Sequence, residues 1–215
     1  MTSARARPRK QHVSRILEAI GAGGRVSAQP SLVMTIGLPG SGKSTFARRL
    51  ARATGAVVLE SDALRRTLFE HPDHGSDESK ALFSAIHEVA RLKLAAGKTV
   101  ILDATNLRRE GRLPAYAIAS ETGARLVLLH FSAPEQVILE RLARRAAATD
   151  PDDRSTAGIA VYRQMAEAAQ PVLEEHWHID TSDAEATESA LTRLLEQLGP
   201  AATIEHGLAT GGSTP

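Results

Sequence analysis

Apolar runs and helix-like patterns alternate along most of the chain. Short apolar stretches, each predicted to be a strand, cover residues 32–36, 56–59, 99–102, 125–131 and 176–179. Stretches with apolar side chains three and four residues apart, each predicted to be a helix, cover residues 44–53, 62–69, 80–96, 109–121, 134–148, 156–169 and the segment around 191–198. Residues 71–79 are polar and irregular, which predicts a loop.

Strands that alternate with helices predict a fold of the α/β class. Helical crossovers between neighbouring strands give a parallel sheet, here of five strands, with helices on both faces. The strands show little polar alternation, as strands buried on both faces do. Ligands of such folds bind beyond the carboxyl ends of the strands, so we expect the functional residues at that edge.

The two ends of the chain differ from this central region, which we place at residues 31–198. Residues 1–30 form a basic arm with Arg5, Arg7, Arg9, Lys10 and Arg15, and apolar positions from 13 to 20 allow a short amphipathic helix in it. The arm is either a polyanion-binding segment or a disordered tail. Residues 199–215 are rich in Gly, Thr and Ala and are expected to form a flexible tail.

Composition narrows the class of protein. The chain has 215 residues, 42% of them hydrophobic and 24% charged, with a net charge of +1. It contains no cysteine, which excludes a disulfide framework, a thiolate zinc site and a cysteine nucleophile. No apolar run reaches the roughly 20 residues that cross a bilayer, and no secretory signal follows the first arginines. We therefore expect a cytoplasmic protein without membrane association and see no sign of an obligate protein partner.

The segment from Gly37 to Thr45 matches the phosphate-binding pattern G-x-x-x-x-G-K-[ST]. Its glycines let successive backbone N–H groups turn toward an anion, and the following helix adds its positive N-terminal end. Lys43 is predicted to reach the β- and γ-phosphates of ATP, and the Ser44 hydroxyl to bind Mg²⁺. The residues predicted to bind the nucleotide are Gly37, Pro39, Gly40, Ser41, Gly42, Lys43, Ser44 and Thr45.

Asp103 follows the apolar strand at 99–102, where a carboxylate can hold Mg²⁺ or a water bound to it. Asp62 and Arg65 follow the strand at 56–59. Asp62 is either a helix cap or a general base for an acceptor hydroxyl, and Arg65 either a solvated charge or a group that binds an anionic acceptor.

Arg141, Arg144 and Arg145 lie on the helix that is predicted from residue 134. Such charges form either a solvated face or part of a helical lid, at about residues 134–169, that neutralises the transferring phosphoryl group. The polar stretch at 149–156 suits the tip of that lid.

These motifs together resemble the polynucleotide-kinase branch of P-loop kinases, over about residues 32–171, and are similar to zeta-toxin-like sugar-nucleotide kinases. The resemblance implies that Asp62 is the base and that Arg65 binds the acceptor phosphate. It also implies that the segment Asp103 to Asn106 belongs to the site and that Arg141 and Arg145 are the lid arginines.

The expected function is that of a Mg-ATP-dependent kinase whose acceptor is a polynucleotide 5′-hydroxyl. Two alternatives stay open: a kinase for a sugar, nucleoside or aminoglycoside-type molecule, and a regulatory NTPase without an acceptor. Detectable transfer to a hydroxyl distinguishes either kinase from the regulatory NTPase. A steep salt dependence of acceptor affinity distinguishes a nucleic-acid acceptor from a small molecule.

Overall fold

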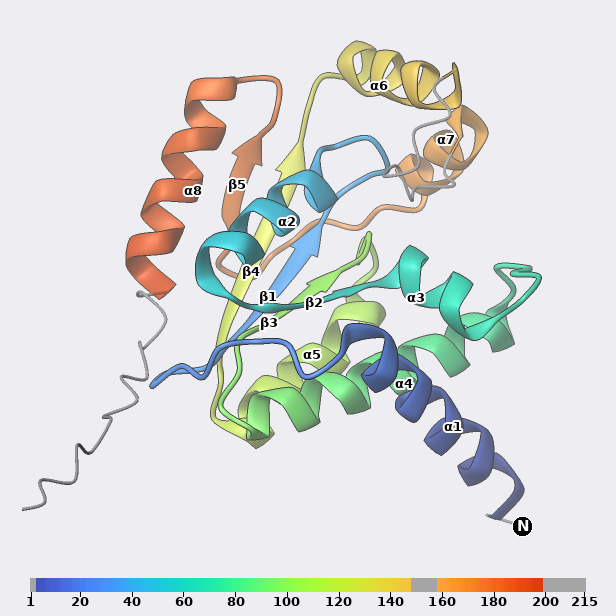
Figure 1. Ribbon diagram of the computed structural model, residues 1–215. Coiled ribbons are helices and arrows are strands. Elements are labelled where there is room, and N and C mark those ends of the chain that lie inside the picture. Colours follow the sequence, from blue (N-terminus) through green and yellow to red (C-terminus); the bar gives the residue numbers. More distant parts are fainter. Residues whose placement is uncertain (1–2, 148–157, 199–215) are drawn as a thin grey trace, which may run out of the picture.

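Five parallel strands form the centre of the protein, in the spatial order β2-β3-β1-β4-β5. The computed structural model describes residues 3–147 and 158–198 (Figure 1). The strands are β1 (Ser31–Ile36), β2 (Val57–Glu60), β3 (Val100–Asp103), β4 (Arg125–Ser132) and β5 (Trp177–Asp180). All neighbouring pairs are parallel, so the carboxyl ends of the five strands lie at one edge. The predicted α/β class and five-stranded parallel sheet are confirmed.

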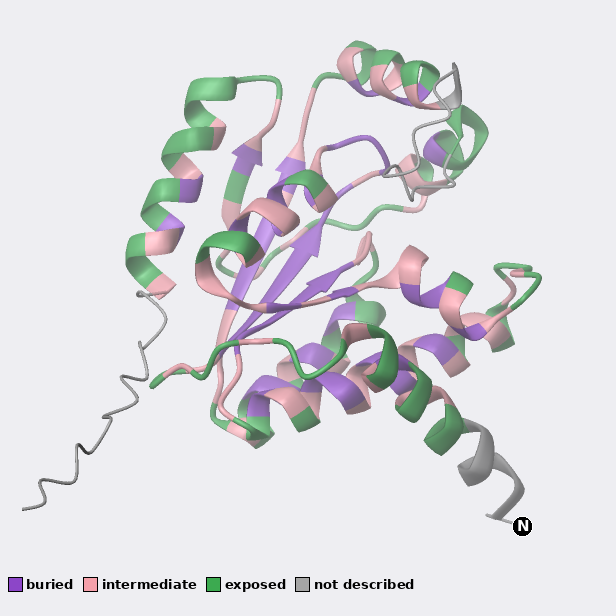
Figure 2. Cartoon of the chain, in the orientation of Figure 1, coloured by how far each residue is buried: buried purple, intermediate pink, exposed green. Residues whose placement is uncertain are grey.

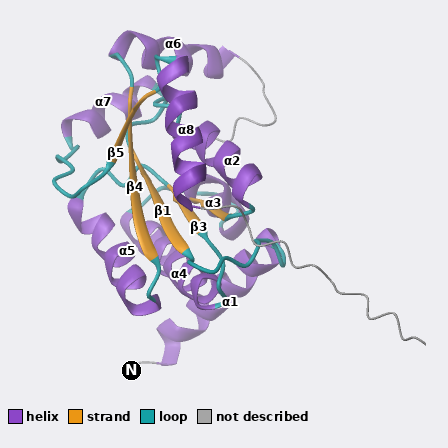
Figure 3. Cartoon of the chain, turned by 90° about the vertical axis from the view of Figure 1, so that its left-hand side faces the viewer, coloured by secondary structure: helices purple, strands orange, loops and turns teal. Residues whose placement is uncertain are grey.

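Eight helices surround this sheet within the described residues. They are α1 (Ser3–Ile20), α2 (Lys43–Thr54), α3 (Ser61–Leu68), α4 (Ser76–Ala95), α5 (Arg109–Thr122), α6 (Glu135–Ala147), α7 (Ile159–Glu167) and α8 (Ala184–Leu198). Helices α2 and α8 cover one face of the sheet, and α3, α4 and α5 cover the other, as the side view in Figure 3 shows. The strands therefore lie inside a three-layer sandwich.

The burial of the central strand β1 explains why its sequence is a continuous apolar run, from which a buried strand could be predicted. Leu32 and Met34 face the layer of α4 and α5, whereas Val33 between them faces α2 and α8. All three side chains are fully buried, so alternate positions along the strand are equally apolar (Figure 2).

The basic N-terminal segment is not a disordered tail over its described part. Residues Ser3–Ile20 form α1, which lies against α3 and α4, and Ile16 is fully buried in the core. The Arg15 guanidinium donates to the backbone oxygens of Thr67, and of Leu68 at 2.8 Å, the last residues of α3. The cause is the apolar spacing at 13–20, which supplies a face that the domain buries.

The polar segment at 71–79, which was predicted to be a loop, is a loop only up to residue 75. Helix α4 begins at Ser76, with Asp77 and Glu78 in its first turn, where acidic side chains favour the helix dipole. The predicted lid tip at 149–156 and the predicted tail at 199–215 lie outside the described residues.

Helices α6 and α7 lie beyond the carboxyl ends of the strands (Figure 1). Ile138 and Leu142 of α6 and Tyr162 of α7 form a small buried cluster of their own, separate from the two layers of the main core. The lid is predicted at about residues 134–169, which include this pair of helices, and its action as a lid stays a prediction. No helix within residues 3–147 and 158–198 combines the length and the apolar character that a bilayer crossing requires.

Candidate active site

The phosphate loop joins the end of β1 to the start of α2. Gly42 immediately precedes α2 with a φ of 88°, in the left-handed region that glycine adopts without strain. Gly40 has a φ of 80°, and a Cβ at this position would lie 2.9 Å from Cγ2 of Ile138 in α6. The Gly37 amide donates to the Thr105 carbonyl at 3.0 Å, which fixes the loop to the segment that follows β3.

Lys43 is held inside the loop. Its side chain is buried, and Nζ donates to the backbone oxygen of Leu38 at 2.7 Å. Burial lowers the pKa of the ammonium group to about 8, although the carboxylates of Asp103 and Asp62 act in the opposite direction. Both carboxylates stabilise the charged form of Lys43, so Lys43, Asp62 and Asp103 interact electrostatically in the same site.

Asp103 ends β3 and is almost fully buried. Its Oδ1 accepts a hydrogen bond of 3.0 Å from the Thr35 hydroxyl, which is also buried. Burial raises the pKa of the Asp103 carboxyl, while the nearby Ser44 hydroxyl and the Lys43 ammonium act to lower it.

The second oxygen of Asp103, Oδ2, is buried and accepts no well-formed hydrogen bond from the described residues. A buried carboxylate oxygen without a partner is costly unless a cation or water uses it. Oxygen ligands are the ones that Mg²⁺ prefers. Ser44 and Asp103 therefore fit a magnesium ion beside the phosphate loop.

The larger cavity of the site has a volume of about 580 Å³. It opens between the phosphate loop, the start of α3, the start of α4 and one side of α7. Predicted site residues line it from one end to the other: Pro39, Gly40, Gly42, Lys43, Ser44, Thr45, Asp62, Arg65, Asp103 and Arg145. The structure thus brings the predicted phosphate, metal and base residues to one cavity.

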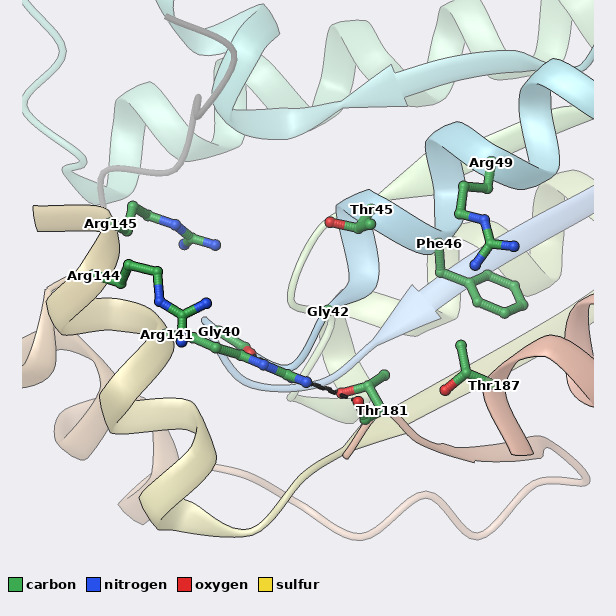
Figure 4. A pocket seen from close by; sticks show the side chains of 10 residues that line it. All are labelled: Gly40, Gly42, Thr45, Phe46, Arg49, Arg141, Arg144, Arg145, Thr181 and Thr187. Atoms are coloured by element: carbon green, nitrogen blue, oxygen red, sulfur yellow. Dashed lines mark hydrogen bonds between the residues drawn. The ribbon is translucent and has the colours of Figure 1, made fainter. Parts of the chain in front are cut away.

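A second cavity of about 400 Å³ lies on the other side of the phosphate loop (Figure 4). Gly40, Gly42, Thr45 and Arg145 line both cavities, so the two meet at the loop. The remaining lining comes from α2, from α6, from the residue after β5 and from α8: Phe46, Arg49, Arg141, Arg144, Thr181 and Thr187. One cavity on each side of a phosphate loop suits a nucleotide and a second substrate.

Arg141 contacts other groups than those predicted for it. Its Nη1 donates to the Thr181 hydroxyl at 2.7 Å and to the Gly40 carbonyl at 3.3 Å, and its Nη2 donates to the Thr181 carbonyl at 2.7 Å. Figure 4 shows the side chain reaching across the floor of the second cavity toward Thr181. Arg141 therefore joins α6 to the phosphate loop and to the end of β5.

Arg65 also has a protein partner in the structure. Its Nη1 forms an ion pair with the Glu78 carboxylate, and its Nη2 donates to the Ser79 hydroxyl at 3.2 Å. The sequence did not reveal this pairing, because nothing in the local pattern shows which side chain of α4 will lie beside α3.

Three further residues of the site escaped the sequence analysis as functional positions. Thr35 positions Asp103, and Thr181 donates to the Ser41 carbonyl at 3.0 Å. Arg112 is fully buried and donates to the carbonyls of Asn106 and Pro171, each at 3.1 Å.

Comparison with known proteins agrees with this geometry. The AAA_33 family, described as an AAA domain, matches residues 32–172. An uncharacterized protein of Mycobacterium tuberculosis is 33% identical over 146 residues, which are 62% of this chain and 29% of that protein. A UPF0200 protein of Aeropyrum pernix is 31% identical over 125 residues, which are 53% of this chain and 64% of that protein. The chain thus spans under a third of the length of the mycobacterial relative.

Solved structures share the fold at low sequence identity. The APS kinase CysC of Mycobacterium tuberculosis, in complex with AMPPNP and APS, has a TM-score of 0.61 at 19% identity and covers 80% of this chain and 99% of that chain. Kti12 of Chaetomium thermophilum, in complex with ADP-AlF3, has a TM-score of 0.60 at 18% identity, with coverage of 78% and 99%. A gluconokinase of Sinorhizobium meliloti has a TM-score of 0.55 at 23% identity, with coverage of 79% and 95%.

These neighbours establish the fold of P-loop kinases for this chain, as the glycine-rich loop between β1 and α2 had indicated. None of the three structures named above is a polynucleotide kinase, so membership of the polynucleotide-kinase branch, which the motifs suggested, remains a prediction. The family match extends over more than half of the chain, and the protein therefore belongs to the AAA_33 family.

Proposed function

We propose that the protein is a Mg-ATP-dependent kinase that transfers the γ-phosphoryl group to a hydroxyl group of a second substrate. The observation that carries this proposal is the cavity of about 580 Å³, which joins the phosphate loop to Asp62 and Asp103. A regulatory NTPase needs a phosphate site and a metal site but no second cavity wall with a carboxylate base. The acceptor side of this cavity therefore favours a kinase.

The nucleotide would bind with its phosphates along the loop. Backbone N–H groups and the start of α2 favour the phosphate oxygens, and Lys43 adds a positive charge at the β- and γ-phosphates. A magnesium ion held by Ser44 and Asp103 would neutralise phosphate charge as the γ-group leaves. The cavity lined by Phe46 and Thr181 would then receive the nucleoside part of ATP.

Asp62 would act as the general base. Asp62 is the second residue of α3 and lines the same cavity as the phosphate loop. An acceptor hydroxyl can lie in this cavity between the Asp62 carboxylate and the loop. The carboxylate would take the hydroxyl proton as the oxygen bonds to the γ-phosphorus and ADP leaves. Arg145 lines both cavities and would stabilise the charge of the transferring group, whereas Arg141 would hold the loop in place.

The test is transfer from γ-labelled ATP in the presence of Mg²⁺ to a mixture of 5′-hydroxyl DNA and RNA oligonucleotides, sugars, nucleosides and aminoglycosides. We expect label on a hydroxyl compound, and we expect Asp62→Asn to lower turnover by roughly 10²–10⁴-fold while ATP binding is kept. Asp77→Asn is the matched control, because the Asp77 side chain is 99% exposed at the start of α4. Normal turnover in Asp62→Asn would show that Asp62 is not the general base. Free phosphate as the sole product would favour a regulatory NTPase.

A further inference from the structure

The acceptor half of the larger cavity has a distinct chemical character. Away from the phosphate loop, it is lined by hydroxyl, amide and imidazole groups together with apolar side chains. The carboxylates of Glu60 and Asp62 and the Arg65 guanidinium line it as well, and the other residues are Ser61, His74, Ser79, Phe83, Ala104, Thr105, Val161, Gln164 and Met165. The other arginines that line the cavity, Arg48 and Arg145, come from α2, which begins at the phosphate loop, and from α6.

Arg65 is the guanidinium group that α3 contributes to this half, and its charge is matched by Glu78. Both side chains are more than nine-tenths buried, at 8% and 9% exposure. Because protein atoms cover most of both side chains, water screens this pair less than a fully exposed pair. An incoming phosphate or carboxylate would therefore have to compete with the Glu78 carboxylate for the charge of this guanidinium, whose buried Nε has no hydrogen-bond partner among the described residues.

Glu78 is also held by hydrogen bonds from the loop before α4. Its Oε2 accepts from the Asp73 amide at 2.9 Å, and its Oε1 accepts from the His74 amide at 3.1 Å. His74 has a φ of 56°, and the Gly75 amide is bound by the Asp73 carboxylate at 2.6 Å, so the loop is a closed turn around Glu78. The ion pair consequently braces α3 against α4 and holds His74 at the cavity wall.

The part of the cavity wall that α3 contributes therefore carries the Arg65 cation paired with Glu78, and it also carries the Asp62 carboxylate. That carboxylate disfavours a second negative charge nearby. Phe83 and Met165 supply apolar surface, while Ser79, Gln164 and Thr105 supply hydrogen-bonding groups. An aromatic ring with a few polar groups around it is the usual lining of sites for small, ring-shaped ligands.

We infer that the acceptor is a small hydroxyl-bearing ring compound that carries no phosphate or carboxylate group, with its ring against Phe83. This inference rests on the proposed kinase function and names the substrate class of the same site. It differs from the role that the family resemblance gives to Arg65, which is to bind an acceptor phosphate. Here Arg65 is a positioning residue, and the acceptor is held by Phe83 and by the neutral polar groups around it.

The test compares matched acceptors with the full chain, γ-labelled ATP and Mg²⁺. One series contains uncharged sugars, cyclitols and nucleosides, and the other contains their phosphate-bearing counterparts together with 5′-hydroxyl oligonucleotides. We expect label on at least one uncharged compound, with kcat/KM at least tenfold above that of its phosphate-bearing counterpart. Preferential labelling of a phosphate-bearing compound overturns this inference and leaves the kinase standing. A protein that binds Mg-ATP but labels neither series overturns the proposed function and this inference with it.

Variants then test the surfaces that the inference names. For the acceptor found, Phe83→Ala should raise the KM at least fivefold without changing the KM for ATP, and Phe83→Tyr, which keeps the ring, should behave as the wild type. Glu78→Gln removes the charge that occupies Arg65 but keeps an oxygen for the loop amides. It should raise kcat/KM for the phosphate-bearing counterpart severalfold relative to the uncharged compound. An unchanged acceptor KM in Phe83→Ala, or no change of preference in a folded Glu78→Gln, contradicts the inference.

Discussion

Replacement of Thr35 by valine tests whether a buried hydroxyl positions the carboxylate at the end of β3. Valine has nearly the same shape as threonine but carries no hydroxyl, so the change removes polar contacts and leaves packing intact. The Thr35 Oγ1 lies 3.0 Å from Asp103 Oδ1 and 3.0 Å from the Ala104 carbonyl, and it accepts from the Ala104 amide at 3.2 Å. The side chain is fully buried, so water cannot replace these partners.

The magnitude follows from the kind of bond that is lost. A hydrogen bond to a charged group contributes about 1.5–3 kcal/mol, and a buried donor without a partner costs about 1–3 kcal/mol. We therefore expect Thr35→Val to lower the free energy of unfolding by about 2 kcal/mol. If half of that loss falls on the geometry of Asp103 in the nucleotide complex, Mg-ATP binding weakens by roughly fivefold.

Urea denaturation gives the first quantity and calorimetric titration with Mg-AMPPNP gives the second. Thr35→Ser is the matched control: it loses one methyl group, at a cost of about 1 kcal/mol, but keeps the hydroxyl. The serine variant should bind Mg-AMPPNP as the wild type does. Equal nucleotide affinity in the valine and serine variants would refute the role of this hydroxyl.

The remaining predictions concern the phosphate loop, the buried Arg112 and the half-buried His87. Gly40→Ala should destabilise the protein by more than about 1 kcal/mol and weaken ATP binding, because its φ is 80° and a Cβ would meet Ile138. Thermal melts of both variants compare it with Gly111→Ala, which lies in an exposed helical position with no atom within 4 Å of the new Cβ and should stabilise the protein by up to about 1 kcal/mol. Arg112→Met should cost about 2–4 kcal/mol in urea, because two backbone carbonyls lose their donor, and a loss under about 1 kcal/mol would speak against this bracing. Burial, aided by Arg91, lowers the pKa of His87 from 6.5 to about 4, so the unfolded chain binds more protons between these values. Stability should fall by up to about 3 kcal/mol as the pH drops from 6.5 to 4, and an NMR titration of His87 with a midpoint near 6.5 would contradict this.

The fold could be predicted because its elements are encoded locally. Each strand is an apolar run, as at Val100 to Leu102, and each helix has a periodic apolar face, so the order of elements and the parallel sheet followed from spacing alone. The phosphate loop was found for the same reason, since its glycines and Lys43 are adjacent in sequence. Boundaries shifted by a few residues, most of all at Ser76, where the polar residues of the first helical turn resemble a loop.

Contacts between distant segments could not be predicted in this way. Arg65 and Glu78 belong to different helices, and Arg141 meets Thr181 across 40 positions of the chain. A local pattern shows that a charged residue is present but not which partner burial will give it. The sequence therefore identified the residues of the site more reliably than their contacts. The cytoplasmic location stays a prediction.

The position of β1 in the sheet has a consequence for synthesis of the protein. Although β1 comes first along the chain, its neighbours are β3 and β4, and β4 ends only at Ser132. At about 5–20 residues per second, the ribosome needs on the order of 5–20 seconds between Ile36 and Ser132. Until Asp103 is made the phosphate loop has no finished strand on either side, and until Ser132 is made it has one on only one side. Ile138, which lies against Gly40 of the loop, is made later still. The nascent chain should therefore acquire nucleotide binding late and in one step, once α6 has left the ribosome.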